Sequence, residues 1–423
     1  MLSEIDNEFL TRVGPGTPMG ELLRRFWIPG LLEEEVPKPD CPQVRLRLLG
    51  EDLVAYRDTN DRVGILDNYC PHRRASLFFG RNEECGLRCV YHGWKYDVEG
   101  NCVDMPSEPA ESNFKDKVKI KAYAAVIRGG VVWVYMGPQE LRPTPPDFEW
   151  SLLPANQRSA TKRLEECNWA QAVEGGIDSS HISFLHRNLK DLREESPKTL
   201  HQKYAGQDRS PAFTLKDTDY GFLVGARRSA ENDHHYWRIS QFLVPFYTMI
   251  PPVLIKDTDS RSSGYGGHAW VPIDDENTWT WNFGCNPHQP YPEKSQSGGL
   301  EEQLDTKYRP IRNKDNDYEL DREMQRITNY TGIVGINTQD RAVQESMGTM
   351  VDRTSEHLGT TDAAVIAFRK RLISLAMSLQ EGVEPVAAAN GDWYRVRSAS
   401  AILKNNVAFD EGAAELLVAQ NAK

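Results

Sequence analysis

The sequence predicts an α+β protein with two domains, an antiparallel β-sandwich followed by a mixed domain of helices and strands. The chain has 423 residues, more than one hydrophobic core usually organises. Residues 44–137 hold short β-rich runs separated by Gly, Asp and Asn clusters, which is typical of a sandwich. Residues 138–146 are rich in proline and indicate a linker. We therefore expect domains at 1–145 and 146–423.

The first domain begins with a predicted helix over residues 10–29. Thr17 can cap this helix, Pro18 suits its first position, and leucines 22 and 23 with Phe26 supply an apolar face. The strands of the sandwich are predicted in the runs VRLRLLG, LVAYRD, VKIKAYAAVI and GGVVWVYMG.

The second domain is predicted from its hydrophobic periodicity. A helix over 168–188 is expected to be interrupted at the glycine pair 175–176, and further helices are expected over 316–326, 339–350 and 361–379. Strand-like patterns cover 222–226, 236–243, 267–272 and 278–283.

Composition excludes several classes of protein. The formal net charge of −11 argues against a nucleic-acid binder, which needs a basic face for phosphates. The first residues lack the apolar segment of a signal peptide, and the longest apolar run is too short to cross a membrane. Seven cysteines are too few for a secreted disulfide scaffold. We expect a cytoplasmic protein with reduced thiols and no membrane partner.

The first motif reads Cys70-Pro-His72, sixteen intervening residues, and then Cys89-Val-Tyr-His92-Gly-Trp. A Rieske [2Fe–2S] centre takes two Cys on one iron and two His on the other. Two loops that each supply one thiolate and one imidazole match that requirement. A structural zinc site is the alternative, but the Cys-x-His pair is closer than zinc-finger ligands usually lie. Cys85 and Cys102 are expected to pack as small apolar residues.

The second motif is a histidine pair five residues apart, His181 and His186. Two His with one carboxylate form the facial triad of non-haem Fe(II) oxygenases. Asp178 lies one helical turn before His181 and can accept a hydrogen bond from the second ring nitrogen of a ligand. On spacing alone the third ligand stays open among five aspartates: Asp317, Asp321, Asp340, Asp352 and Asp362.

Four segments resemble the large (α) subunit of Rieske non-haem iron ring-hydroxylating oxygenases. Within that family they resemble the phthalate dioxygenase branch, which also includes aromatic O-demethylases. The likeness covers most of the chain and thins after about residue 380. The segments are VGPGTPMGELLRRFWIP, CVYHGWKYD, NWAQAVEGGIDSSHISFLH and NKDNDYELDR…TQDRAVQESMG.

The resemblance implies roles for eight residues. The cluster ligands would be Cys70, His72, Cys89 and His92, the iron ligands would be His181, His186 and Asp340, and Asp178 would join the cluster of one subunit to the iron of its neighbour. It also implies a helix-grip (START-like) catalytic domain and a homotrimer or a stacked pair of trimers. Some relatives place an asparagine where this chain has Glu174, to which we assign no role.

The implied reaction is that of a terminal oxygenase. Electrons would pass from NAD(P)H through a flavin and [2Fe–2S] reductase to the cluster, and then to Fe(II), where O₂ reacts with an aromatic carboxylic acid. Ring dihydroxylation and oxidative O-demethylation of a methoxylated, lignin-type acid need the same iron site.

A carboxylated substrate needs a cation, and the planar fork of arginine matches a carboxylate. Our candidate is Arg238 on a predicted strand, where it shares a face with Tyr236 and Ser240; Arg227 and Arg228 are weaker candidates. The alternative is an arginine on the surface of a strand.

Two other functions stay open at this point. In the first, the chain is a Rieske electron carrier with a non-catalytic interaction domain, and the His pair is inert. In the second, it is a zinc-stabilised binding module.

Overall fold

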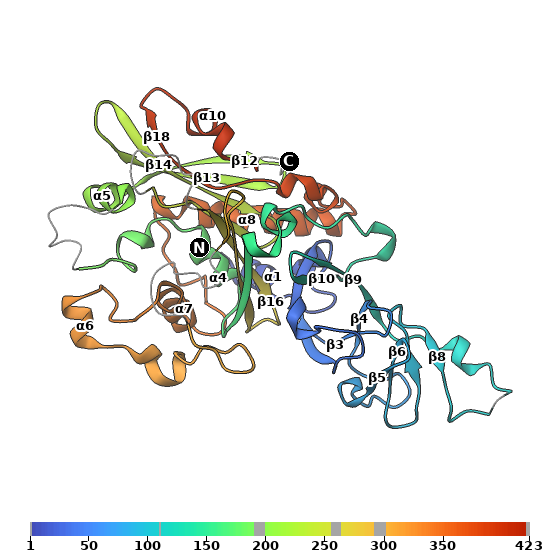
Figure 1. Ribbon diagram of the computed structural model, residues 1–423. Helices are drawn as coiled ribbons and strands as arrows, with labels where there is room; N and C mark the ends of the chain where they lie inside the picture. Colours follow the sequence, from blue (N-terminus) through green and yellow to red (C-terminus); the bar gives the residue numbers. More distant parts are fainter. Residues whose placement is uncertain (1, 110, 190–198, 255–263, 292–301, 420–423) are drawn as a thin grey trace.

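The computed structural model describes residues 2–109, 111–189, 199–254, 264–291 and 302–419. These residues form three sheets, and every pairing between their strands is antiparallel (Figure 1). The α+β fold class is therefore confirmed.

The first two sheets belong to the N-terminal third of the chain. The six-stranded sheet has the order β1-β10-β9-β4-β3-β2, with β1 (Trp27–Leu32), β2 (Val44–Leu48), β3 (Glu51–Arg57), β4 (Val63–Asp67), β9 (Ala122–Arg128) and β10 (Val131–Tyr135). The four-stranded sheet has the order β5-β6-β7-β8, with β5 (Arg81–Glu83), β6 (Gly86–Arg88), β7 (Lys95–Tyr96) and β8 (Cys102–Asp104).

The third sheet has eight strands, in the order β11-β17-β16-β15-β14-β13-β12 with β18 beside β14. Its strands are β11 (Arg158–Glu165), β12 (Ala212–Thr218), β13 (Gly221–Ser229), β14 (His234–Leu243), β15 (Tyr247–Ile250), β16 (Tyr265–Pro272), β17 (Thr278–Cys285) and β18 (Ala399–Lys404). The four strands predicted in the second domain are confirmed as parts of β13, β14, β16 and β17.

The predicted helix over 10–29 is wrong, because two short helices and a strand replace it. They are α1 (Glu4–Thr11), α2 (Pro18–Leu23) and β1. The Gly-Pro-Gly turn at 14–16 separates the two helices, and the buried residues from Trp27 onward pair with β10. The predicted start of α2 is confirmed, since Thr17 caps it and Pro18 opens it.

The helix predicted over 168–188 is shorter than expected. α4 (Trp169–Ile177) begins at the N-cap Asn168 and continues through both glycines. It ends at Asp178, and a 3-10 turn, η6 (His181–Ser183), follows. The helix is therefore not interrupted at the glycine pair, as was expected, but ends at Asp178, just before the histidines.

The helix predicted over 316–326 is also corrected. The 3-10 segment η8 (Lys314–Glu319) has left-handed φ values of 50° and 55° at Asp317 and Tyr318, so no continuous helix can pass through it. α6 (Arg322–Ile327) begins only after it. The later predictions are confirmed with shifted ends, as α7 (Ile336–Ser346) and α8 (Ala363–Gln380). The remaining helices are short: α3 (Glu149–Leu152), α5 (Leu200–Gln207), α9 (Val386–Ala389) and α10 (Phe409–Gly412).

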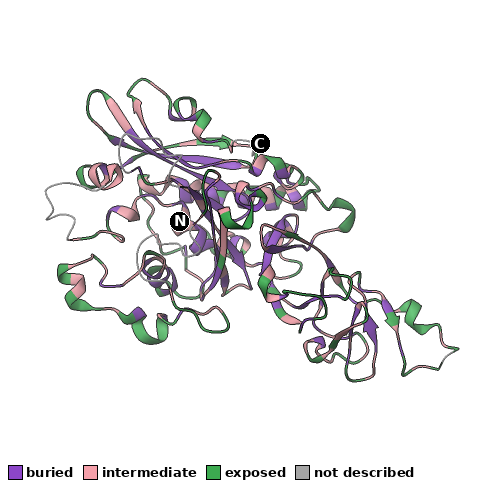
Figure 2. Ribbon diagram, viewed as in Figure 1, coloured by how far each residue is buried: buried purple, intermediate pink, exposed green. Residues whose placement is uncertain are grey.

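The eight-stranded sheet wraps two helices, as the predicted helix-grip arrangement requires. α4 packs against β14, β15 and β16. Phe368 of α8 meets Phe242 of β14 with ring centroids 5.2 Å apart and Trp169 of α4 with centroids 6.0 Å apart. Figure 2 shows this buried centre, where α4 and α8 lie within the curve of the sheet.

One hydrophobic cluster continues from this centre into the six-stranded sheet, where it includes Trp133. α1 and α2 pack on α8 although they precede the first sheet in sequence. The proposed division into 1–145 and 146–423 stays a prediction. Among the described residues, no helix is both long and apolar enough to cross a bilayer.

Candidate functional site

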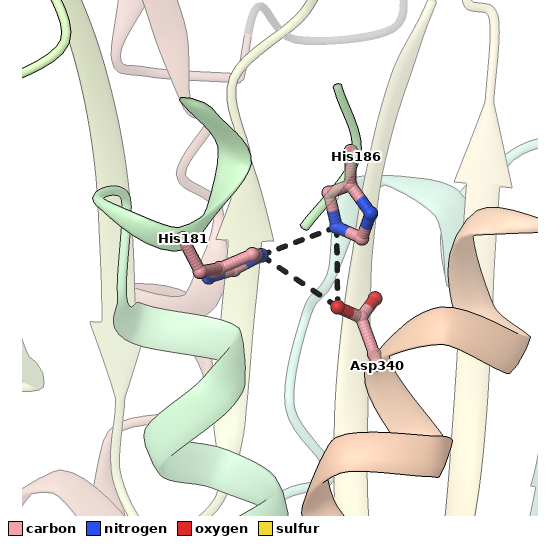
Figure 3. A group of neighbouring side chains, drawn as sticks. All are labelled: His181, His186 and Asp340. Atoms are coloured by element: carbon pink, nitrogen blue, oxygen red, sulfur yellow. Dashed lines mark hydrogen bonds and ion pairs between the residues drawn. The ribbon is translucent and has the colours of Figure 1, made fainter. Parts of the chain in front are cut away.

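Three predicted site residues converge on one point: His181 on η6, His186 just after it, and Asp340 on α7 (Figure 3). The Nε2 atoms of the two histidines lie 3.2 Å apart. The Asp340 Oδ1 atom lies 3.1 Å from Nε2 of His186 and 3.6 Å from Nε2 of His181. Two imidazole nitrogens and one carboxylate oxygen therefore face each other, which is the donor set that suits Fe(II).

The other four aspartates left open by spacing do not join this group. Three of them accept local backbone hydrogen bonds instead: Asp321 from the first turn of α6, Asp352 from Thr354, and Asp362 from Gly359. Asp317 lies in the left-handed part of η8. In the described ranges, His181, His186 and Asp340 are the only set of three or more His, Cys, Asp or Glu side chains whose ligand atoms all lie within 4.8 Å of one another, close enough to share one metal ion.

Asp178 contacts the first histidine, as its position in the sequence predicts. Its Oδ2 atom lies 3.4 Å from Nδ1 of His181, the ring nitrogen that faces away from Asp340. The backbone N–H groups of Ser180 and His181 also donate to this carboxylate, at 2.6 and 3.3 Å. Burial raises the pKa of Asp178, but the hydrogen bonds and charge of His181 outweigh it and lower the pKa overall. Asp178 thus stays ionised beside the centre.

The second histidine is held by a residue that our sequence analysis did not single out. Oε1 of Gln339 lies 2.8 Å from Nδ1 of His186. Burial lowers the pKa of His186, whereas its hydrogen bond with Asp340 and the Asp340 charge raise it, and the net shift is upward. Gln339 and Asp340 thus contact His186 at its two different ring nitrogens.

The two predicted cluster loops follow β4 and β6. Cys70 and Cys89 are buried at 1% and 3% exposure, while the imidazoles of His72 and His92 lie nearer the surface with ring centroids 4.4 Å apart. The Nδ1 atom of His72 is buried and has no hydrogen-bond partner among the residues that the structure describes. Two inner thiols and two outer imidazoles fit a [2Fe–2S] cluster with a sulfur-bound and a nitrogen-bound iron.

Local turns shape these loops. The N–H of Arg74 donates to the Cys70 carbonyl at 2.8 Å, and the N–H of Gly93 donates to the Cys89 carbonyl at 3.0 Å. Gly93 has φ +79°, which glycine adopts without strain. The indole of Trp94 stacks on the ring of His72 with centroids 4.3 Å apart, so one face of the loop pair is covered.

A cavity of about 730 Å³ opens beside the three converging donors, which form part of its wall. Arg238 and Ser240 of β14 line the same cavity. Arg238 is 5% exposed, so the alternative of a surface arginine is wrong. Among the described residues, Arg238 makes one long hydrogen-bond contact, of 3.5 Å to Nδ1 of His201, and its Nε has no partner.

The surroundings of Arg238 leave its charge uncompensated. Burial and the charge of Arg238 lower the pKa of His201 to about 2, so this histidine is neutral. No salt bridge joins Arg238 to a carboxylate among the described residues. The weaker candidates differ: Arg227 is exposed, and Arg228 is buried and donates to the Asp208 carbonyl. Arg238 is thus a cation facing the cavity without an anion.

Glu174, to which we assigned no role, lies away from the donors in a buried ion-pair group. Its Oε1 accepts from Arg353 at 3.1 Å and from Arg369 of α8 at 2.8 Å. Burial raises the pKa of Glu174, but the charge of Arg353 and the contacts with Arg369 lower it overall. The residue therefore links α4 to α8.

Comparison with known proteins gives two family matches. Residues 26–124 match the Rieske [2Fe-2S] domain, and residues 134–419 match the LigXa C-terminal domain like family. The chain is 41% identical to the phthalate 4,5-dioxygenase oxygenase subunit of Pseudomonas putida, over 90% of this chain and 88% of that one. It is 33% identical to the 5,5'-dehydrodivanillate O-demethylase oxygenase subunit of a Sphingobium species, over 92% and 83%.

A solved structure with the same fold is that of dicamba monooxygenase bound to dicamba. The TM-score is 0.59 at 18% sequence identity, and the match covers 85% of this chain and 99% of that one. At this identity the likeness concerns the fold.

Proposed function

Because this chain belongs to the family of Rieske non-haem iron oxygenases, we propose that it oxidises an aromatic carboxylic acid with O₂ and with electrons from a reductase. The observation that carries the proposal is the convergence of His181, His186 and Asp340 in the wall of a cavity that also contains Arg238, which has no carboxylate partner among the described residues. An electron carrier would need neither the donor set nor the cavity.

In this proposal the two metal sites have separate tasks. His181, His186 and Asp340 would hold mononuclear Fe(II), and the loops after β4 and β6 would hold the cluster through Cys70, His72, Cys89 and His92. When bound, the cluster supplies electrons and the iron, with its open positions, supplies the site for O₂. The residues around them fix the ligands and position the substrate.

Arg238 is the proposed anchor for the substrate carboxylate. A buried guanidinium without an anionic partner is costly, and a carboxylate that enters the cavity would satisfy it. The acids named for the two relatives, phthalate and dehydrodivanillate, are both aromatic carboxylates. Whether the ring is dihydroxylated or a methoxy group is removed depends on which substrate atom the cavity holds next to the iron.

The assembly we propose is a homotrimer, alone or stacked in pairs. Figure 1 gives one reason for it: β6, which precedes the second proposed cluster loop, lies at the opposite end of the molecule from α7, so the two proposed sites of one chain are separated. Exposed apolar side chains lie both near the proposed cluster loops, at Phe79, Val90 and Tyr91, and on or just after α7, at Ile336 and Met347. Such surfaces are typical of protein contacts. Asp178 would then lie on the path of the electrons that pass from the cluster of the neighbouring subunit to the iron. The cytoplasmic location of the protein stays a prediction.

Metal analysis tests the proposal. We expect about three Fe per chain, two in the cluster and one at the second site. The variants His186→Ala and Asp340→Ala should lower the content to about two and leave the visible and EPR spectra of the cluster unchanged. About two Fe in the unaltered protein would favour the electron carrier, and zinc without a Rieske spectrum would favour a binding module.

A further inference from the structure

Gln339 is the residue that precedes Asp340 on α7, and its amide is held at both ends. The Nε2 atom donates to the carbonyl oxygen of Ile333 at 2.8 Å. The Oε1 atom lies 2.8 Å from Nδ1 of His186. The side chain is buried at 6% exposure, so water does not compete for either contact.

These two contacts fix the proton on His186. A carbonyl oxygen can only accept, so the atom that faces Ile333 must be the NH₂ of Gln339. The atom that faces His186 is then the amide oxygen, which also only accepts. Nδ1 of His186 must therefore carry the hydrogen, and the lone pair of the neutral ring lies on Nε2.

The lone pair then points into the donor group. Nε2 of His186 faces Oδ1 of Asp340 at 3.1 Å and Nε2 of His181 at 3.2 Å. Asp178 orients His181 in the same way, since its Oδ2 atom lies 3.4 Å from Nδ1 of His181. Both imidazoles are thus turned by a neighbour toward the position that the metal would take, a recurring arrangement in metal sites.

We propose that Gln339 is a positioning residue for the iron site, which holds His186 in the Nδ1–H tautomer so that Nε2 is available as a metal ligand. The inference rests on the proposed function, because it assumes that the three donors bind a metal. It adds that two adjacent residues of α7 have different tasks: Asp340 is a proposed metal ligand, and Gln339 holds the ligand His186. A shift of α7 would therefore disturb both ligands.

The test compares variants that separate the two contacts of Gln339. Gln339→Leu removes both. Gln339→Glu keeps an acceptor for His186 but cannot donate to the carbonyl of Ile333. The matched control is Gln171→Leu, which removes another buried amide that ties α4 to the end of α7 through the carbonyls of Gln344 and Gly348.

Metal affinity is the readout, measured by Co(II) titration of protein from which the non-cluster iron has been removed, with the Co(II) absorption spectrum as the signature of the ligand set. We expect Gln339→Leu to lower the affinity by about 10- to 100-fold. Gln339→Glu should stay within about threefold of the unaltered protein, as should Gln171→Leu, and the Rieske spectrum should be the same in all of them.

Three results would overturn the inference: unchanged affinity in Gln339→Leu, an equal loss in Gln171→Leu, or no rescue by Gln339→Glu. The failure of the proposed function is distinguishable from these results. In that case the unaltered protein itself would bind no Co(II) outside its cluster.

Discussion

At the residue scale, Asp178 lies at the end of α4 and contacts a proposed iron ligand. Replacing it by Asn keeps the size of the side chain and removes the charge that His181 faces. We expect Asp178→Asn to retain the cluster and the second iron but to lose product formation by at least about 100-fold, because electrons no longer reach the iron efficiently.

Product formation and iron content are measured together for this variant. The control is Asp321→Asn, which changes the cap of α6 to another good capping residue and should leave activity unaltered. Normal turnover in Asp178→Asn with both metal sites filled would contradict the proposed role.

Arg238 is proposed to make the site prefer a negatively charged substrate over a neutral one. A charge-assisted hydrogen bond contributes about 1.5–3 kcal/mol, so Arg238→Ala should raise the apparent KM for an aromatic acid by roughly 10- to 100-fold. The KM for a neutral analogue of the same shape, such as the amide, should change much less. Arg227→Ala on the neighbouring strand is the control, since that side chain is exposed. Similar effects on acid and amide would show that Arg238 does not bind the carboxylate.

Individual residues differ in how far the sequence predicts them. The proposed cluster ligands follow from residue type and spacing, because both loops are short and each supplies its ligands locally. Asp340 lies 154 positions after His186, and spacing alone left it among five aspartates, so only the family resemblance selected it. Gln339 has no signal of its own, since its contact with His186 exists only after α7 has packed against the turn that follows α4.

At the element scale, the fit of α4 against the sheet positions Asp178 and His181. A Cβ atom on Gly176 would lie 1.9 Å from the ring of Trp270, which is buried on β16. We expect Gly176→Ala to destabilise the protein by about 1–3 kcal/mol and to lower its iron content, because α4 must move away from β16.

Denaturant unfolding and iron analysis check this prediction. The control is Gly206→Ala on α5, where a Cβ would meet nothing within 4 Å and should stabilise slightly or have no effect. Equal stability of the two variants would show that the close approach of α4 and β16 does not matter.

Helices and strands were predictable from the sequence where one face of the element is buried and the apolar residues recur regularly within it. The strands of the large sheet were found because their apolar alternation persists over several residues. The helix over 10–29 was wrong because Trp27–Leu32 is buried on all sides, and a continuous apolar run does not distinguish strand from helix. The break near the histidines was displaced because the two glycines serve packing in α4 and do not end it.

At the scale of the whole molecule, β6, which precedes the second proposed cluster loop, lies far from α7, which carries the proposed iron ligand Asp340 (Figure 1). The sequence predicts both sites but not the path between them, since a path through a neighbouring subunit depends on contacts outside the chain. The oxidation of an aromatic acid by the reduced protein, however, can be measured without a reductase.

The most direct measurement is a single turnover. The protein is reduced chemically, freed of reductant and mixed with O₂ and a panel of aromatic acids, and the oxidation of the cluster is followed together with the product. We expect product in proportion to the cluster oxidised, as a diol that carries both oxygen atoms of O₂ or as a phenol with formaldehyde. Cluster oxidation without product for every acid, with the second iron present, would contradict it.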